Sequence, residues 1–138
     1  VQNYLRHLSA GLRDKKILVL QEPGDNNLID TLKEIPLFQN LQITEGNHHN
    51  IERISSNDLT IISTRVLQAS SNRDRTFTEI MTKKTSDKAL IFFAPHGEES
   101  LDLKKKEFED INARSLTTVT RASGRLANDV LSLLTFLA

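Results

Sequence analysis

Cysteine is missing from this chain of 138 residues. Without thiols, the protein has no disulfide framework, no thiolate metal site and no cysteine nucleophile, which is typical of a protein that resides in a reducing compartment. We therefore expect a cytoplasmic location. The length corresponds to one ordinary domain, and because the chain does not begin with methionine, we expect that domain to belong to a longer protein.

Long hydrophobic runs and an excess of charge of one sign are also missing. The apolar runs are far too short to cross a bilayer, and the first residues do not resemble a signal peptide. Lysine plus arginine number 18, as do aspartate plus glutamate. The composition therefore gives no electrostatic support for a nucleic-acid partner or an anionic membrane, and we expect neither nucleic-acid binding nor direct membrane insertion.

The chain does contain three short, predominantly aliphatic runs. Residues 17–20, 58–63 and 89–94 each indicate a strand that is buried on both faces. Residues 41–46 and 115–120 are rich in strand-forming residues but more polar, which is typical of strands at the edges of a sheet. Apolar residues at helical spacing follow each strand; these segments lie within residues 28–35, 47–54, 71–81, 98–112 and 124–137.

Local signals place some of the helix starts. Ser71, with Asp74 three positions later, resembles a capping box before the third of these helices, and Ser123 is positioned to cap the last one. The residues between the third strand and Ser71 are expected to form a loop. Residues 1–14 carry Leu5 and further apolar side chains at helical spacing, and we interpret them as a separate N-terminal helical segment.

Five strands that are each followed by a helix predict a mostly parallel sheet with helices on both faces. The three apolar strands belong inside this sheet and the two polar strands belong at its edges. The sequence therefore predicts a three-layer, doubly wound α/β domain over residues 15–138, with the flavodoxin-like strand order 2-1-3-4-5.

Ligands of such folds bind beyond the carboxyl ends of the strands, near the point between strands one and three where the strand order reverses. The polar residues expected there or nearby are Glu22, Asp25, Ser63, Thr64 and Arg121. Glu22 and Asp25 supply the hard oxygen ligands that a divalent cation prefers, whereas the alternative is that Asp25 or Asn26 caps the first helix and Glu22 is solvated. We favour the cap and expect neither a metal nor a cofactor.

His96 is the candidate general base, since it follows the fourth strand and imidazole titrates near neutral pH. No serine or cysteine forms a nucleophile elbow that would be its partner. His48 and His49 are adjacent, so their side chains point in different directions, and we interpret both as exposed residues rather than ligands of one ion.

The predicted layout resembles the receiver domains of two-component signalling over nearly the whole chain. Those domains carry an acidic pair after the first strand, a phosphorylated aspartate after the third, serine or threonine after the fourth and lysine after the fifth. The corresponding positions here are Glu22 with Asp25, Ser63 or Thr64, Ala94, and Arg121. Because no aspartate follows the third strand, the resemblance implies a pseudo-receiver that lacks the phosphoryl acceptor.

The layout is also similar to that of TIR domains. In those domains the third strand often ends in serine, and a glutamate on the next helix acts in NAD cleavage. Ser63 and Glu79 lie at about those places in this sequence. This second resemblance implies a small nucleotide- or NAD-processing enzyme, with Glu79 as a catalytic residue.

Of these two functions, the sequence favours a non-catalytic regulatory or protein-interaction domain. The last helix carries more apolar residues than one sheet face needs, and Leu131 and Phe136 are the candidate interface residues. The partner is either another protein or a second copy of the chain. The alternative is that Leu5 and its neighbours in the N-terminal segment cover this helix within one molecule.

Overall fold

The computed structural model describes residues 15–22, 28–34, 41–94 and 102–137. The predicted N-terminal helical segment, with Leu5, lies outside the described residues, as do Asp25 and His96. In chain order, the elements are β1 (Lys16–Leu20), α2 (Leu28–Lys33), β2 (Gln42–Gly46), the 3-10 helix η2 (Ile51–Ser56), β3 (Leu59–Ser63), α3 (Thr64–Ala69), α4 (Arg73–Lys83), β4 (Ala89–Phe93), α5 (Lys105–Ala113), β5 (Thr117–Thr120) and α6 (Ser123–Leu137).

The five strands form one sheet in the order β2-β1-β3-β4-β5, and all four neighbouring pairs are parallel. This confirms the predicted flavodoxin-like α/β fold. The two polar strands are the edges of the sheet, because a polar strand can leave one side in water, whereas a central strand in such a fold is covered on both faces.

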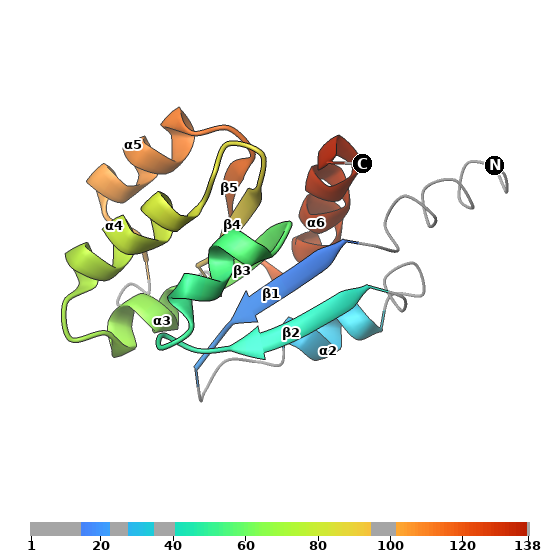
Figure 1. Cartoon of the computed structure of the whole chain (residues 1–138), viewed down its shortest axis with the longest axis horizontal. Coiled ribbons are helices and arrows are strands. Elements are labelled where there is room, and N and C mark those ends of the chain that lie inside the picture. The colour runs from blue at the N-terminus through green and yellow to red at the C-terminus, as the bar shows by residue number, and fades with distance from the viewer. Residues whose placement is uncertain (1–14, 23–27, 35–40, 95–101, 138) are drawn as a thin grey trace, which may run out of the picture.

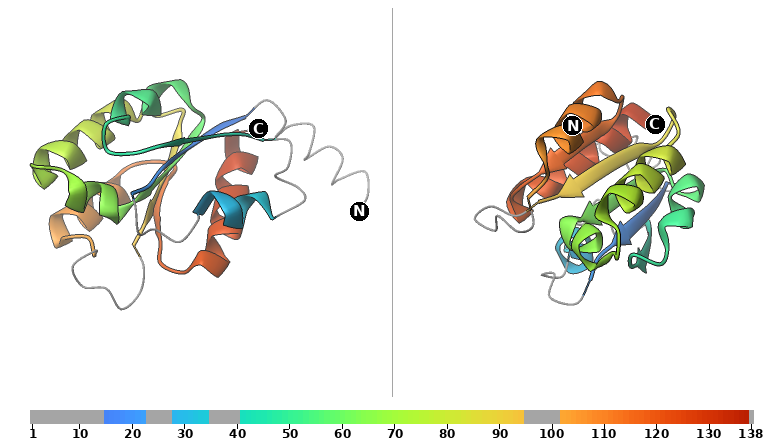
Figure 2. Two further views of the ribbon diagram at one scale, coloured as in Figure 1. Left: turned by 90° about the horizontal axis from the view of Figure 1, so that it is seen from below. Right: turned by 90° about the vertical axis from the view of Figure 1, so that its left-hand side faces the viewer.

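Helices cover both faces of the sheet and complete three layers (Figure 1). Figure 2 shows α2 and α6 together on one side, while η2, α3 and α4 lie on the other. In β1, Ile17 and Val19 point into the core under α2 and α6, whereas Leu18 and Leu20 point into the opposite core. All four side chains are fully buried, which is why this strand is apolar at every position after its first.

Two local predictions were wrong. The segment after β3, expected to be a loop, forms α3, whose Val66 and Leu67 are buried. The side chain of Asn72, and not that of Ser71, caps α4 by accepting a hydrogen bond from the backbone N–H of Arg75. Both residue types favour this position, so the pattern of Ser71 and Asp74 placed the cap one residue too early.

Some of the other elements are shorter than predicted. The helix expected over residues 98–112 begins at Lys105 within the described part. The last strand begins at Thr117, because Leu116 adopts a left-handed backbone conformation with a φ of 54° that no strand residue can share. The short helix after β2 is the 3-10 helix η2, with Ile51 and Ile54 buried.

Candidate functional site

Glu22 follows β1 and is held by His48, which follows β2. One carboxylate oxygen of Glu22 accepts hydrogen bonds from the backbone N–H of His48 at 2.9 Å and pairs with its ring Nδ1 at 2.5 Å. The side chains are 12% and 27% exposed, so the pair is largely withdrawn from water. His49 lies beside His48, with the two ring centres 3.9 Å apart. The expectation of exposure was therefore wrong for His48, as was that of a solvated Glu22. The two histidine rings also lie against each other and do not point apart as predicted.

The residues that end β3 are fully buried. Ser63 accepts a hydrogen bond from the backbone N–H of Arg65 and so caps α3. Thr64 is the first residue of that helix, and its hydroxyl oxygen is buried without a hydrogen-bond partner among the described residues. Gln21 follows the neighbouring strand β1, and its side-chain amide oxygen is also buried without a hydrogen-bond partner among the described residues. Its side-chain amide nitrogen donates to Glu45 at 2.8 Å.

Arg121 follows β5 and points toward α5 and the chain before it. Its guanidinium forms an ion pair with Asp102 at 3.0 Å and lies 5.3 Å from the centre of the Phe108 ring, which is a cation–π distance. The backbone N–H of Leu103 donates a hydrogen bond to Asp102, and together with Arg121 it holds the pKa of that carboxyl below its usual value. Arg121 is therefore already engaged by one acidic and one aromatic partner.

The sheet order separates Arg121 from Glu22. Three strand spacings lie between β1 and β5, which corresponds to about 14 Å. The structure thus brings Glu22 together with His48, and Arg121 together with Asp102 and Phe108, but it does not bring Glu22 and Arg121 to one point.

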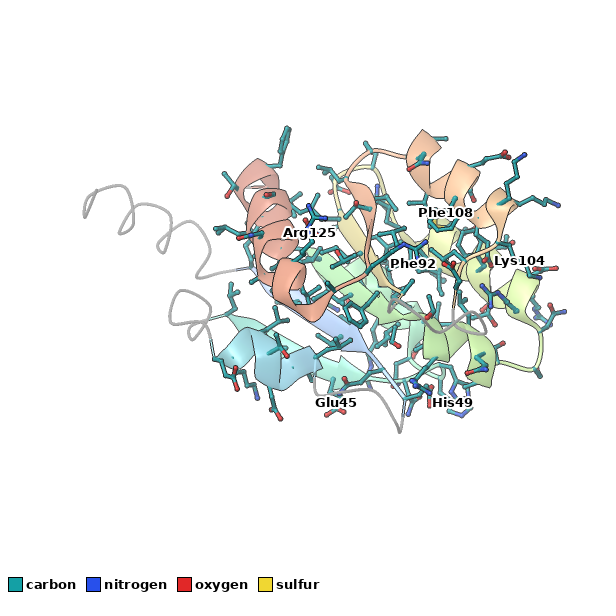
Figure 3. All side chains as sticks on the ribbon, turned by 180° about the vertical axis from the view of Figure 1, so that it is seen from behind. Glu45, His49, Phe92, Lys104, Phe108 and Arg125 are labelled. Atoms are coloured by element: carbon teal, nitrogen blue, oxygen red, sulfur yellow. The ribbon has the colours of Figure 1, made fainter. Side chains whose placement is uncertain are left out.

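A groove of about 510 Å³ runs along the outer edge of β5, between α5 and α6. Figure 3 shows Phe108 on the α5 side of this groove and Arg125 on the α6 side. The floor is formed by the strand itself and by the turn that follows it. The lining residues are Phe108, Asn112, Thr118, Val119, Thr120, Arg121, Ala122, Arg125 and Asp129.

The remaining candidates lie elsewhere on the described surface. Glu79 is not on the helix that directly follows β3 but on α4, where its half-exposed carboxylate pairs with Arg75 one turn earlier. On α6, Leu131 is partly buried against the core, whereas Phe136 is 82% exposed. Among the described residues, Phe136 is the large hydrophobic side chain that faces water.

Sequence reasoning missed the partners of Arg121. Asp102 comes before α5 and Phe108 lies within it, far from Arg121 in sequence, and no local pattern joins them. The parallel topology gives a weak signal. Because β4 and β5 are parallel, the chain leaves both strands at the same end of the sheet, so charged residues shortly after either strand can meet there.

Within the described part of the chain, no group of three or more histidine, aspartate or glutamate side chains is arranged to hold a metal ion. No described helix is long and apolar enough to cross a membrane. No known protein-family model matches the sequence, and the search of curated proteins found no match.

Proposed function

We propose that the chain is a non-catalytic regulatory or protein-interaction domain with a fold like that of a pseudo-receiver. The observation that carries this proposal is the engagement of the polar groups at the strand ends with one another. Glu22 is held by His48, Ser63 caps a helix, and Arg121 is paired with Asp102. A catalytic carboxylate or base must instead reach its substrate directly or through one water molecule.

The surface that we assign to the partner is the outer side of α6. Leu126, Val130 and Leu134 form the buried stripe of this helix, and Phe136 lies off that stripe in water. Burial of a phenylalanine side chain contributes roughly 2 kcal/mol, so its exposure costs free energy that contact with a partner recovers. The partner is another protein or a second copy of the chain.

Sedimentation equilibrium of the full chain, with Phe136→Ser as the variant, tests the self-association form of this proposal. We expect the average mass of the parent chain to rise with concentration and that of Phe136→Ser to stay at the monomer. Ser132→Ala, an exposed change on the same helix, is the matched control and should behave like the parent. A parent chain that remains a monomer at high concentration excludes self-association through α6.

A second candidate is a small nucleotide- or NAD-processing enzyme that uses the crevice between β1 and β3. The observation in its favour is the pair of buried oxygens without hydrogen-bond partners, Gln21 Oε1 and Thr64 Oγ1, at the ends of these two strands. An unsatisfied buried polar atom costs about 1–3 kcal/mol, which a ligand that donates a hydrogen bond would recover.

Thermal shift with NAD and common nucleotides, combined with an assay for turnover, separates the two candidates. A ligand that binds the native state raises the melting temperature once its concentration exceeds its dissociation constant. On the enzyme hypothesis, Thr64→Val abolishes this shift. On the interaction-domain proposal, no shift and no turnover occur, and Thr64→Val is neutral or stabilising because it removes the unsatisfied hydroxyl.

A further inference from the structure

The hydrogen bonds between β4 and β5 show which backbone groups of β5 face outward. The carbonyl of Leu116 accepts from the N–H of Leu90, and the carbonyl of Thr120 accepts from the N–H of Ala94. In a parallel pair, alternate residues bond to the neighbouring strand, and the residues between them direct both backbone groups to the other side. With the observed pairing of Ile91 with Thr118, the N–H and C=O groups of Thr117 and Val119 point into the groove.

This edge strand is short but carries neither the charges nor the proline that often prevent strand addition. Native edge strands carry charged residues, proline or bulges that discourage pairing with another chain. The other edge strand, β2, contains Glu45. In contrast, β5 consists only of β-branched residues, Thr117 to Thr120, without a charge or a proline. All four residues are of types that favour the extended backbone of a strand.

The groove beside this edge contains Arg125, whose charge has no counter-charge bonded to it among the described residues. Arg121 is paired with Asp102. Asp129 accepts a hydrogen bond from the hydroxyl of Thr120 at 2.5 Å and keeps its negative charge. The exposed side chain of Arg125 has no ion pair or hydrogen bond to any residue that the structure describes. A segment lying in the groove therefore passes a guanidinium without a counter-charge among the described residues, which favours an acidic side chain opposite Arg125.

We propose that the outer edge of β5 binds an extended, acidic peptide segment of a partner protein, which adds to the sheet as a sixth strand. The backbone groups of Thr117 and Val119 supply the main-chain hydrogen bonds, and Arg125 selects an acidic residue. Strand addition of this kind draws its affinity from the main chain and its specificity from the side-chain positions.

The shape of the edge favours a peptide over a second copy of the chain. The strand lies in a groove between α5 and α6, and two identical grooves cannot fill each other. A single extended segment, in contrast, fits between the two helices. This surface does not include Phe136. The peptide-binding proposal and the proposed contact through α6 are therefore tested separately, and either one can be rejected without the other.

The test is a selection from a library of random peptides, each long enough to run the length of β5, against the full chain. We expect enriched sequences that alternate β-branched and other residues and that contain aspartate or glutamate. The enriched peptides are then synthesised, and their affinities are measured for the parent chain and for two variants that alter different features of the groove.

Val119→Pro removes one outward N–H without breaking a bond to β4, since proline is tolerated where the N–H of an edge strand faces solvent. We expect about tenfold weaker binding, the loss that corresponds to one backbone hydrogen bond. Arg125→Glu leaves the strand unchanged and should also weaken binding, with a smaller effect at high salt. Lys105→Glu, exposed on α5 outside the groove, changes the net charge equally and should bind like the parent.

Two results would overturn the proposal. One is a selection without enrichment, or enriched peptides whose binding is unaffected by both groove variants. The other is rapid disulfide formation between two copies of Thr118→Cys. In an antiparallel pairing of two β5 strands centred on this residue, its Cα atoms come about 4.5 Å apart, which is within disulfide reach. Because the parent chain has no cysteine, a dimer would report this contact alone and would assign the edge to a second copy.

Discussion

At the scale of single residues, Arg73 joins three parts of the helical layer that contains α4 and α5. Its guanidinium donates to both carboxylate oxygens of Glu107, at 3.1 and 2.7 Å, and to the backbone carbonyl of Asp102 at 2.8 Å. Glu107 is 4% exposed and also accepts from the backbone N–H of Lys104. This bidentate geometry is the strong form of an ion pair, and it fixes the segment that presents Asp102 to Arg121.

Removing one partner of this pair should be costly. Glu107→Ala leaves the guanidinium of Arg73 largely buried without its counter-charge, and we expect a loss of about 3 kcal/mol in the free energy of unfolding. Urea denaturation measures this loss. The exposed Glu109→Ala on the same helix is the control and should stay within about 0.5 kcal/mol of the parent chain. Equal effects of the two changes would contradict the importance of the buried pair.

The pH dependence of stability should reveal Asp102. Its pKa is lowered by the hydrogen bond from Leu103 and by Arg121, so its ionised form is favoured in the folded state. The resulting stability is present above the unfolded-state pKa of about 3.9 and is lost as the pH falls through the lower folded-state value.

We therefore expect Asp102→Asn to lower the melting temperature at neutral pH, and the difference from the parent chain to shrink as the pH falls below about 4. Melting curves across this pH range measure the difference. Asp30→Asn, at an exposed position of α2, controls for the loss of one negative charge. A difference that stays constant down to the lowest pH would show that Asp102 acts through packing and not through its charge.

At the scale of elements, the central strands were predictable and the short helix α3 was not. Strands β1, β3 and β4 are covered on both faces, so their sequences are mostly apolar and can be recognised as buried strands. In contrast, α3 has six residues, fewer than two helical turns, and its cap is the last residue of β3. Such a segment is too short for a helical period to stand out from the sequence.

The start of α4 provides a prediction at this scale. The side chain of Asn72 accepts from the backbone N–H of Arg75 at 3.1 Å, so Asn72→Ala should cost about 1 kcal/mol of stability. Ser71→Ala, one position earlier, should change stability by less than about 0.5 kcal/mol. Chemical denaturation compares the two variants, and a larger loss from Ser71→Ala would place the helix start where the sequence pattern had predicted it.

At the scale of the whole molecule, the polarity of the strands predicted their order. The two polar strands were assigned to the edges and the three apolar strands to the interior, which gave the flavodoxin-like order. The candidate site was predicted only in outline. The position of Arg121 at a strand end follows from topology, but its contacts with Asp102 and Phe108 depend on which way the side chain turns. No residue pattern in the sequence encodes that choice.

The same topology makes β5 an open edge, and amide hydrogen exchange of the full chain tests this claim most directly. We predict that the amides of Thr118 and Thr120, which bond to β4, exchange slowly, while the amide of Val119 between them exchanges fast. Equal protection of all three amides in the isolated chain would contradict the account, because the edge would then already be covered.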